Sequence, residues 1–356
     1  MQRLLYITTN LDNSGGVARI LSVKLNYLVE TYGYHVSVIN TNTITDIFFY
    51  HFSSKIKFYS IETKNLFKYR NELREVVDRI NPNIIINCDN GLKGALLPFL
   101  INYKRALLYE RHCGSSVLTD GLLERLKFKV SNAVLKLRIK KYRAFVVLNA
   151  EEKQDWKSNN VLVISNPMWF KSDSTIALLK NKTTIAVGRF SYQKGYDVLL
   201  NIWKIVVDNY PEWKLNIYGE GDKDNFIELA LELNVLDSVQ FLNPVEDIKS
   251  VYLNASMLLN TSRYEPFGLS VIEAMACGLP VITFDNALGP KNYIISGENG
   301  FLIEKDNLEI YAQKIMFLME NEDERLRISS NAKNVVKDYN LDAIMKQWHE
   351  LFQSIQ

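Results

Sequence analysis

Two carboxylates lie eight positions apart around a short apolar run, YEPFGLSVIEAMACG at residues 264–278. Pro266 and Gly268 favour a loop that enters a helix, so we expect Glu265 in the loop and Glu273 inside the helix. Eight helical residues rise about 12 Å, comparable to a sugar, a diphosphate and a ribose laid end to end. Carboxylates accept strong hydrogen bonds from hydroxyl groups. This spacing suits Glu265 to a sugar and Glu273 to a ribose, with phosphate or sugar facing the N–H groups of Phe267, Gly268 and Leu269.

A second segment, AVGRFSYQKGYDVLL at residues 186–200, places two cations directly after an expected strand. Arg189 offers a planar fork and Lys194 a point charge, a pair suited to a diphosphate. Open α/β sheets bind ligands at the carboxyl ends of their strands, where both side chains are expected. The alternative is two solvated loop charges.

Further glycines and acids follow strands in both halves of the chain. Gly15 and Gly16 precede a helix whose N–H groups and dipole favour an anion, although a tight strand-to-helix turn needs glycine in any case. Asp222 and Asp224 form an Asp-x-Asp pair that could hold a divalent metal. Acids at a helix start also act as caps, and we favour capping here.

Short apolar runs rich in β-branched and aromatic residues alternate with segments of helical period, which indicates βαβ units and parallel sheets. The alternation pauses at VISNPMWFKSDS, residues 163–174, and then restarts. The fold class predicted is α/β, with two Rossmann-like doubly wound domains at 1–166 and 167–340. The expected strands are residues 4–8, 35–40, 84–88, 106–109 and 144–148 in the first half and 183–188, 214–219, 239–242, 257–260 and 280–284 in the second.

The last segment, residues 341–356, predicts one helix with a continuous apolar face. It packs either back on the N-terminal domain or within the C-terminal half, and the pattern alone leaves both open. The apolar positions are Leu341, Ile344, Met345, Trp348, Leu351, Phe352 and Ile355.

The composition restricts the class of protein. The 42 basic and 40 acidic side chains nearly balance, so the global charge indicates no nucleic-acid partner. Three scattered cysteines fit neither a disulfide framework nor a zinc site and favour a reducing cytoplasm. Neither a signal-peptide core nor an apolar run of about 18 residues is present, so we expect a cytoplasmic protein, soluble or peripheral to a membrane.

One segment departs from the balanced charge. RLKFKVSNAVLKLRIKKYR at residues 125–143 contains eight cations and no acid. If it is helical, its cations lie beside an apolar face, as in helices that lie at a membrane interface. A solvated basic face is the alternative, and a break near Ser131 and Asn132 would split the helix. The cations within one arc are Arg125, Lys129, Lys136, Lys140 and Arg143.

Together these motifs resemble the retaining, metal-independent glycosyltransferases of the GT4 type with the GT-B fold. The resemblance lies in Gly15-Gly16, VGRFSYQKGYDVLL, YGEGD, EPFGLSVIEAMACGLPVI and DNALGPKNYIISGENGFLI, and it is specific in the C-terminal half. It implies two domains that face across a cleft. The sequence departs from the family in two places. Arg111 stands where relatives often have other residues, and Asn292-Tyr293 stand where many have an acidic residue.

The resemblance also implies roles for individual residues. Arg189 and Lys194 would bind the donor diphosphate, Glu273 the ribose, and Glu265 with the following backbone the transferred sugar. His112 would contact the donor sugar near the reacting carbon, and Val245 would lie beside the nucleobase. The implied mechanism is front-face displacement with retention and without a metal ion or other cofactor.

The function expected is transfer of a hexose or N-acetylhexosamine from a nucleotide sugar, with uridine favoured over guanosine. The acceptor is expected to be a glycan or a lipid-linked sugar in surface polysaccharide or glycolipid assembly, at an anionic membrane surface that the basic segment contacts. The alternatives are a nucleotide-sugar 2-epimerase of the same fold and a non-catalytic membrane-associated scaffold.

Overall fold

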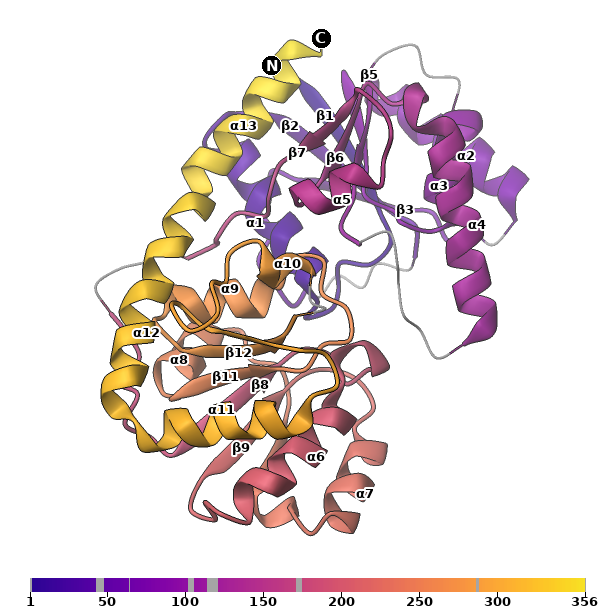
Figure 1. Ribbon diagram of the computed structural model, residues 1–356. Coiled ribbons are helices and arrows are strands. Elements are labelled where there is room, and N and C mark those ends of the chain that lie inside the picture. Colours follow the sequence, from indigo (N-terminus) through magenta and orange to yellow (C-terminus); the bar gives the residue numbers. More distant parts are fainter. Residues whose placement is uncertain are drawn as a thin grey trace. The chain divides into compact units, whose positions relative to one another are not determined.

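The computed structural model describes residues 2–42, 48–63, 65–101, 106–113, 121–170, 175–285 and 288–355. The chain divides into two compact units, and each is described here by itself (Figure 1). Unit 1 consists of Met1–Trp169 and Leu341–Gln356, and unit 2 consists of Phe170–Asn340. The change of unit thus falls after Trp169, close to the expected boundary at 166.

Unit 1 is built on a parallel sheet of seven strands in the order β3-β2-β1-β4-β5-β6-β7. The five expected strands are present as β1, β2, β4, β5 and β6. The sequence analysis misses β3 and β7, because β3 has no buried residue and β7 has only three residues. The bounds are β1 (Arg3–Thr8), β2 (His35–Asn40), β3 (Lys57–Ser60), β4 (Ile84–Asn87), β5 (Ala106–Glu110), β6 (Ala144–Val147) and β7 (Val161–Val163).

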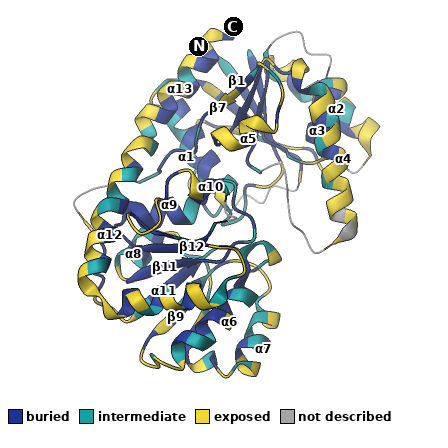
Figure 2. Cartoon of the chain, viewed as in Figure 1, coloured by how far each residue is buried: buried dark blue, intermediate teal, exposed yellow. Residues whose placement is uncertain are grey.

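Helices cover both faces of this sheet, because successive strand residues point to opposite sides. Leu4 and Tyr6 pack in one core with α1 and α13, whereas Leu5 and Ile7 pack in another with α2, α3 and α4. The buried strands and the exposed outer helix faces are visible in Figure 2. The helices are α1 (Gly16–Glu30), α2 (Leu66–Ile80), α3 (Leu92–Leu100), α4 (Leu122–Arg138), α5 (Ala150–Gln154) and α13 (Leu341–Ser354), with a short 3-10 helix at Ile139–Lys141.

The C-terminal helix α13 belongs to the core of unit 1. Its side chains at Ile344, Met345, Trp348 and Phe352 are buried among residues of α1, β1 and β2. Tyr27 on α1 also donates a hydrogen bond of 2.7 Å to Asp342. The alternative of packing within the C-terminal half is therefore wrong, although the predicted apolar face is present.

Unit 2 is a parallel sheet of six strands in the order β10-β9-β8-β11-β12-β13. The five expected strands are present, and β13 is an additional short edge strand. The strands are β8 (Thr183–Val187), β9 (Lys214–Tyr218), β10 (Val239–Leu242), β11 (Met257–Asn260), β12 (Val281–Phe284) and β13 (Phe301–Ile303).

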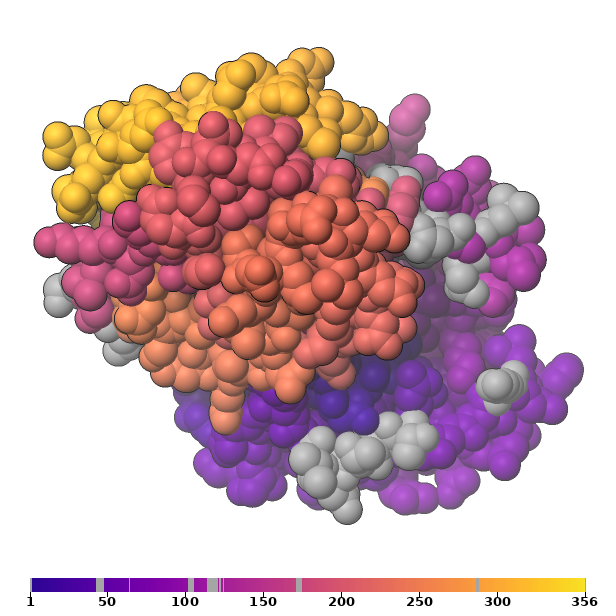
Figure 3. All heavy atoms as spheres, turned by 90° about the horizontal axis from the view of Figure 1, so that it is seen from below, coloured from indigo at the N-terminus to yellow at the C-terminus, as the bar shows by residue number. Residues whose placement is uncertain are grey.

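Four helices of unit 2, α6, α7, α11 and α12, contribute to a large apolar core that includes Trp203 and Tyr311. Figure 3 shows the surface of the molecule from below, with all heavy atoms as spheres. The helices are α6 (Tyr196–Val207), α7 (Asp224–Glu232), α8 (Ile248–Leu253), α9 (Leu269–Ala276), α10 (Leu288–Lys291), α11 (Leu308–Glu320) and α12 (Glu322–Val335), with 3-10 helices at Tyr192–Lys194, Leu236–Ser238 and Val336–Tyr339.

The strand orders confirm two doubly wound domains and locate their binding edges. In such sheets ligands bind outside the carboxyl ends of the strands, where the strand order reverses. The order reverses between β1 and β4 in unit 1 and between β8 and β11 in unit 2. The loop after β8 carries Arg189 and Lys194, and the loop after β11 carries Glu265.

Candidate functional site

In the loop after β8, the side chain of Lys194 passes close over the backbone of Gly188. A Cβ atom on Gly188 would lie 2.5 Å from Cε of Lys194, so only glycine lets the lysine stem pass so closely. Gly195 follows with a φ of +65°, and a Cβ there would lie 2.3 Å from the carbonyl oxygen of Thr261. The hydroxyl of Thr261 donates to the carbonyl of Gly195 at 2.9 Å. These contacts fasten the loops after β8 and β11 to each other.

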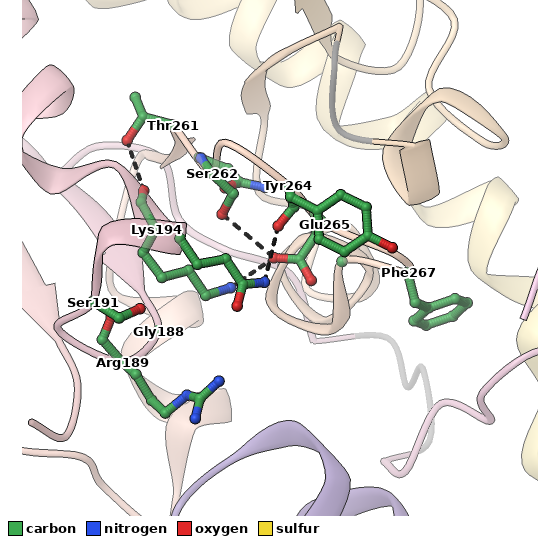
Figure 4. Close-up of polar contacts among 12 residues, drawn as sticks. Gly188, Arg189, Ser191, Lys194, Thr261, Ser262, Tyr264, Glu265 and Phe267 are labelled. Carbon is green, nitrogen blue, oxygen red and sulfur yellow. Dashed lines mark hydrogen bonds and ion pairs between the residues drawn. The ribbon is translucent and has the colours of Figure 1, made fainter. Parts of the chain in front are cut away.

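Lys194 and Glu265 meet where these two loops touch (Figure 4). Nζ of Lys194 lies 2.6 Å from Oε2 of Glu265, and both side chains are mostly buried. Ser262 donates a longer hydrogen bond of 3.4 Å to the same carboxylate oxygen. Gln193 holds the loop by donating to the carbonyl of Tyr264 at 2.9 Å. The structure thus pairs the cation expected at a diphosphate with the carboxylate expected at a sugar.

Arg189 comes from the same loop as Lys194 but has a different setting. Its side chain is exposed and extends away from the Lys194–Glu265 pair in Figure 4. A guanidinium that is open to solvent can bind a second phosphate oxygen without first breaking a buried ion pair.

The start of α9 is held by contacts from the short helix α10. Gly268 has a φ of +81°, a left-handed conformation that favours glycine, and no side chain caps the helix. Gly289 donates to the carbonyl of Glu265 at 2.8 Å, and a Cβ there would lie 2.4 Å from the backbone of Phe267. Among the described residues no side chain caps the N-terminal amides of α9, which include Leu269, and such amides favour a negative charge.

Tyr293, one of the residues that depart from the family pattern, supports this helix start. Its hydroxyl donates to the carbonyls of Phe267 at 2.8 Å and of Gly268 at 3.2 Å. Burial raises the pKa of Tyr293 far above its ordinary value, so the hydroxyl remains a donor. The departure from the family pattern thus has a structural task at this position.

Glu273 lies one turn inside α9, on a buried face. Tyr252 on α8 donates a hydrogen bond of 2.9 Å to its Oε2 atom, and both residues are buried. The partly buried setting expected for Glu273 is confirmed, whereas sequence analysis misses Tyr252. The premise of eight helical residues between the two carboxylates is wrong, because α9 begins at Leu269 and the four residues before it are not helical. Val245 is half-buried in the loop after β10, at the same edge of the sheet.

The Asp-x-Asp pair makes a local contact at the start of α7. The side chain of Asp222 accepts a hydrogen bond of 3.0 Å from the backbone N–H of Asp224, the first residue of the helix. This contact shapes the turn before the helix, whereas the N-cap residue itself, Lys223, makes no side-chain cap, so the expected N-cap by an acid is not what the structure shows.

In unit 1, two glycines stand at the start of α1. Gly15 is the N-cap residue, Gly16 is the first residue of the helix, and no side chain caps it. Asn13 shapes the turn by accepting a hydrogen bond of 2.7 Å from the N–H of Gly15. The helix start follows β1 and is consistent with the anion site expected there.

His112 follows β5 in unit 1 and is buried within a charged cluster. Its Nε2 atom lies 3.4 Å from Oε1 of Glu110, which also accepts a hydrogen bond from Lys24. Burial lowers the pKa of His112, the Glu110 carboxylate opposes this effect, and Lys24 adds to it. The imidazole is therefore neutral near pH 7. Sequence analysis misses Glu110 and Lys24, because nothing local links residues so far apart.

Arg111 points to the opposite side of the same strand end. Its guanidinium donates to Glu152 at 3.0 Å and to Asn132 at 3.0 Å. Burial raises the pKa of Glu152 to about 7, with Arg111 opposing the shift. This second departure from the family pattern therefore joins β5 to α4 and α5.

The basic segment differs in part from its predicted shape. Helix α4 runs unbroken through Ser131 and Asn132, so the alternative of a helix split at these residues is wrong. The helix ends at Arg138, so Lys140 and Arg143 lie beyond it and do not belong to its cationic face. Both residues are exposed. Arg125, Lys129 and Lys136 are exposed and fall on one side of the helix at 100° per residue. Much of the surface of α4 is exposed in Figure 2.

Several apolar side chains of α4 are also exposed. Leu123 is 71% and Leu137 80% exposed, and Leu126 and Val130 extend the same stripe. At 100° per residue this stripe lies beside the cationic one. No helix in the described part of the chain is long and apolar enough to span a membrane.

Comparisons with known proteins agree with this fold. The family "Glycosyl transferases group 1" matches residues 169–335, which are most of unit 2. HepE of Anabaena, solved in complex with UDP-glucose, superposes with a TM-score of 0.79 at 17% identity, over 99% of this chain and 100% of that one.

Relatives in sequence extend over both units. An uncharacterized glycosyltransferase of Haemophilus influenzae is 30% identical and covers 98% of this chain and 99% of its own length. The amylovoran biosynthesis glycosyltransferase AmsD of Erwinia amylovora is 27% identical, over 99% of both chains. With two doubly wound units and a family match over the site-bearing one, the chain belongs to the group 1 glycosyltransferases of the GT-B fold.

Proposed function

We propose that the chain transfers a hexose or N-acetylhexosamine from a UDP-sugar to a glycan or lipid-linked acceptor, with retention, in surface polysaccharide or glycolipid assembly. The observation that carries this proposal is the contact of Lys194 with Glu265 at the carboxyl ends of β8 and β11. The relative in amylovoran biosynthesis supports the polysaccharide acceptor, and the relative bound to UDP-glucose supports the donor.

Three groups of unit 2 suit the leaving diphosphate. Lys194 supplies a partly buried cation, Arg189 an exposed guanidinium, and the start of α9 uncapped amides. Positive charge at these positions stabilises the negative charge that develops as the bond from the sugar to the phosphate breaks. We therefore propose that transfer requires no metal ion or other cofactor.

The remaining groups orient the donor. Glu265 and the N–H groups of Phe267, Gly268 and Leu269 suit sugar hydroxyls, while Glu273 suits the ribose, with Val245 beside the base. The acceptor oxygen attacks the anomeric carbon from the face that the phosphate leaves. The proton of the acceptor passes to the departing phosphate oxygen, so no protein nucleophile is required. In unit 1, we assign the start of α1 to the phosphates and His112 to the sugar.

Calorimetry with UDP, GDP, ADP and CMP tests the donor site, in the presence of EDTA so that no metal contributes. We expect UDP to bind most tightly and Arg189→Ala to weaken its binding about 10- to 150-fold, because a hydrogen bond to a charged group contributes roughly 1.5 to 3 kcal/mol. Lys180→Ala is the matched control, since Lys180 is also an exposed cation of unit 2. If the protein bound none of the four nucleotides, the result would instead support the alternative of a non-catalytic membrane-associated scaffold.

We further propose that α4 docks unit 1 on an anionic membrane, where a lipid-linked acceptor would lie. Its apolar stripe at Leu126 and Leu137 stands beside the cations Lys129 and Lys136. Helices that combine these two stripes lie in the membrane interface, and each cation near an anionic leaflet contributes about 1 kcal/mol.

Flotation with anionic liposomes tests this docking. We expect wild type to float with the vesicles and Lys129→Gln/Lys136→Gln to bind them about 30-fold more weakly, since two cations contribute on the order of 2 kcal/mol. Leu126→Ser/Leu137→Ser, which leaves the charge unchanged, should also lose binding. Lys55→Gln/Lys57→Gln is the control, because these exposed cations of unit 1 lie outside α4. Equal recovery of all variants would contradict the proposal.

A further inference from the structure

A buried polar cluster in unit 1 surrounds Glu110, the last residue of β5. Its Oε1 atom accepts a hydrogen bond from Lys24 on α1 and lies 3.4 Å from Nε2 of His112. Its Oε2 atom accepts a contact of 3.8 Å from the thiol of Cys88, which follows β4. All four side chains are buried. One carboxylate thus joins three elements of the unit around His112.

The C-terminal helix completes this cluster from the other side of Lys24. The Lys24 ammonium lies 3.5 Å from the centre of the Trp348 ring on α13. An ammonium over an indole face is attracted to it, most strongly where water is excluded. Trp348 therefore restricts Lys24 to the position from which it bonds Glu110.

Stability alone is a poor explanation for this arrangement. Removing two charges from water costs several kcal/mol for each ion, and buried pairs are often no more stabilising than apolar residues of similar size. Lys24 and Glu110 are both almost fully buried, with exposed side-chain fractions of 1% and 2%. A role beyond packing would explain a pair that costs so much to bury.

Metal binding is the first such role to consider. Cys88, Glu110 and His112 each offer one ligand atom, and these atoms lie within 4.8 Å of one another. The Lys24 ammonium already bonds Glu110, however, and it would repel a divalent cation at this short range. The Lys24 ammonium therefore balances the charge of Glu110 in this cluster, in place of a metal ion.

We propose that Glu110 is the positioning residue of His112, and that Lys24 and Trp348 hold Glu110 in place. The inference rests on the proposed contact of His112 with the donor sugar. The Nε2 atom of His112 is buried and forms no hydrogen bond to any described residue, and Glu110 is the carboxylate beside it. The Glu110 carboxylate, 3.4 Å from Nε2, favours the tautomer with the proton on that nitrogen, and this tautomer leaves Nδ1 as an acceptor for a sugar hydroxyl. Through Trp348, α13 then supports the orientation of His112.

The protonation of His112 gives a readout that does not depend on sugar transfer. The charged and titratable groups around the imidazole are Glu110 from β5, Lys24 from α1, Cys88 after β4 and Tyr6 from β1. Removing the carboxylate by Glu110→Gln should lower the pKa of His112 further. Removing the ammonium by Lys24→Met should raise it, because the imidazolium would become the counter-ion of Glu110.

Nuclear magnetic resonance of the full chain labelled with ¹⁵N-histidine measures both effects. The chain has four histidines, and His112→Asn identifies the signals of His112. We expect wild type to carry the proton on Nε2 and the two variants to shift the titration of His112 in opposite directions. Glu152→Gln is the matched control, since this buried carboxylate pairs with Arg111 instead. Circular dichroism of each variant monitors folding.

Kinetics of the same variants complete the test. Glu110→Gln is expected to lower kcat about tenfold, as loss of an orienting outer partner does at other sites, with little change in donor KM. An unchanged tautomer and titration in both variants would overturn the inference, even if activity fell. Tight zinc binding that is lost in Cys88→Ala would overturn it in favour of a metal site. Failure of the proposed function would appear separately, as loss of UDP binding in calorimetry.

Discussion

Replacing Glu265 with alanine is expected to lower kcat about 100- to 1000-fold, the range observed when one preorganised stabilising group is removed from an active site. The KM for the donor should change much less. Glu265 is assigned to the reacting sugar, whereas its partner Lys194, 2.6 Å away, is assigned to the diphosphate. Loss of the carboxylate releases Lys194 to bind phosphate, so the donor still binds.

Steady-state kinetics with varied donor and acceptor measure this effect. Glu273→Ala is the informative comparison, because it should weaken donor binding about 10- to 150-fold by removing a charged acceptor at the ribose. Glu228→Ala on the exposed side of α7 is the neutral control. Equal kcat and KM values in the Glu265 and Glu273 variants would refute the different roles of the two carboxylates. Turnover of the donor without any acceptor would favour the 2-epimerase.

Replacing Lys194 with alanine is expected to weaken UDP binding about 10- to 150-fold, for the loss of one charged hydrogen bond to phosphate. It should also lower the thermal stability of the unliganded protein. Glu265 is mostly buried and loses its cation in this variant, and a buried charge without a partner is strongly destabilising. Calorimetry and thermal unfolding measure the two effects on the same samples.

Two further variants separate charge from geometry at this position. Lys194→Arg keeps the charge, but the planar guanidinium does not fit the narrow path over Gly188, so we expect only partial recovery of binding. Lys204→Ala removes an exposed lysine of α6 that pairs with Asp208 at 2.8 Å, and it should change neither property. UDP affinity of Lys194→Ala equal to wild type would remove Lys194 from the donor site.

Local patterns predict the elements of this protein well where apolar residues repeat regularly. The ten expected strands are all present, and the apolar face of α13 was predicted residue by residue. The same patterns fail where an element is short or ends without a clear signal. The edge strands β3, β7 and β13 were missed, and the basic helix was extended beyond Arg138, because charge periodicity continues into the turn that follows.

The partners of the site residues are the features that local patterns do not contain. Glu273 bonds Tyr252, 21 positions away, and Glu110 bonds Lys24, 86 positions away. Sequence spacing within one helix or strand carries no information about such pairs. They depend on which strands are neighbours and on which helix covers each face of the sheet.

Residue type and local pattern are enough to predict which side chains follow the strands: the glycines, the cations and the two carboxylates after β8 and β11. Their positions after strands follow from hydrophobic periodicity, which is a local property. Which of these side chains meet depends on the fold of the whole chain: Lys194 pairs with Glu265, His112 lies beside Glu110, and α13 packs in unit 1. This is so because a parallel sheet brings the carboxyl ends of distant strands to one edge, and the strand order that does so is not encoded in any single segment.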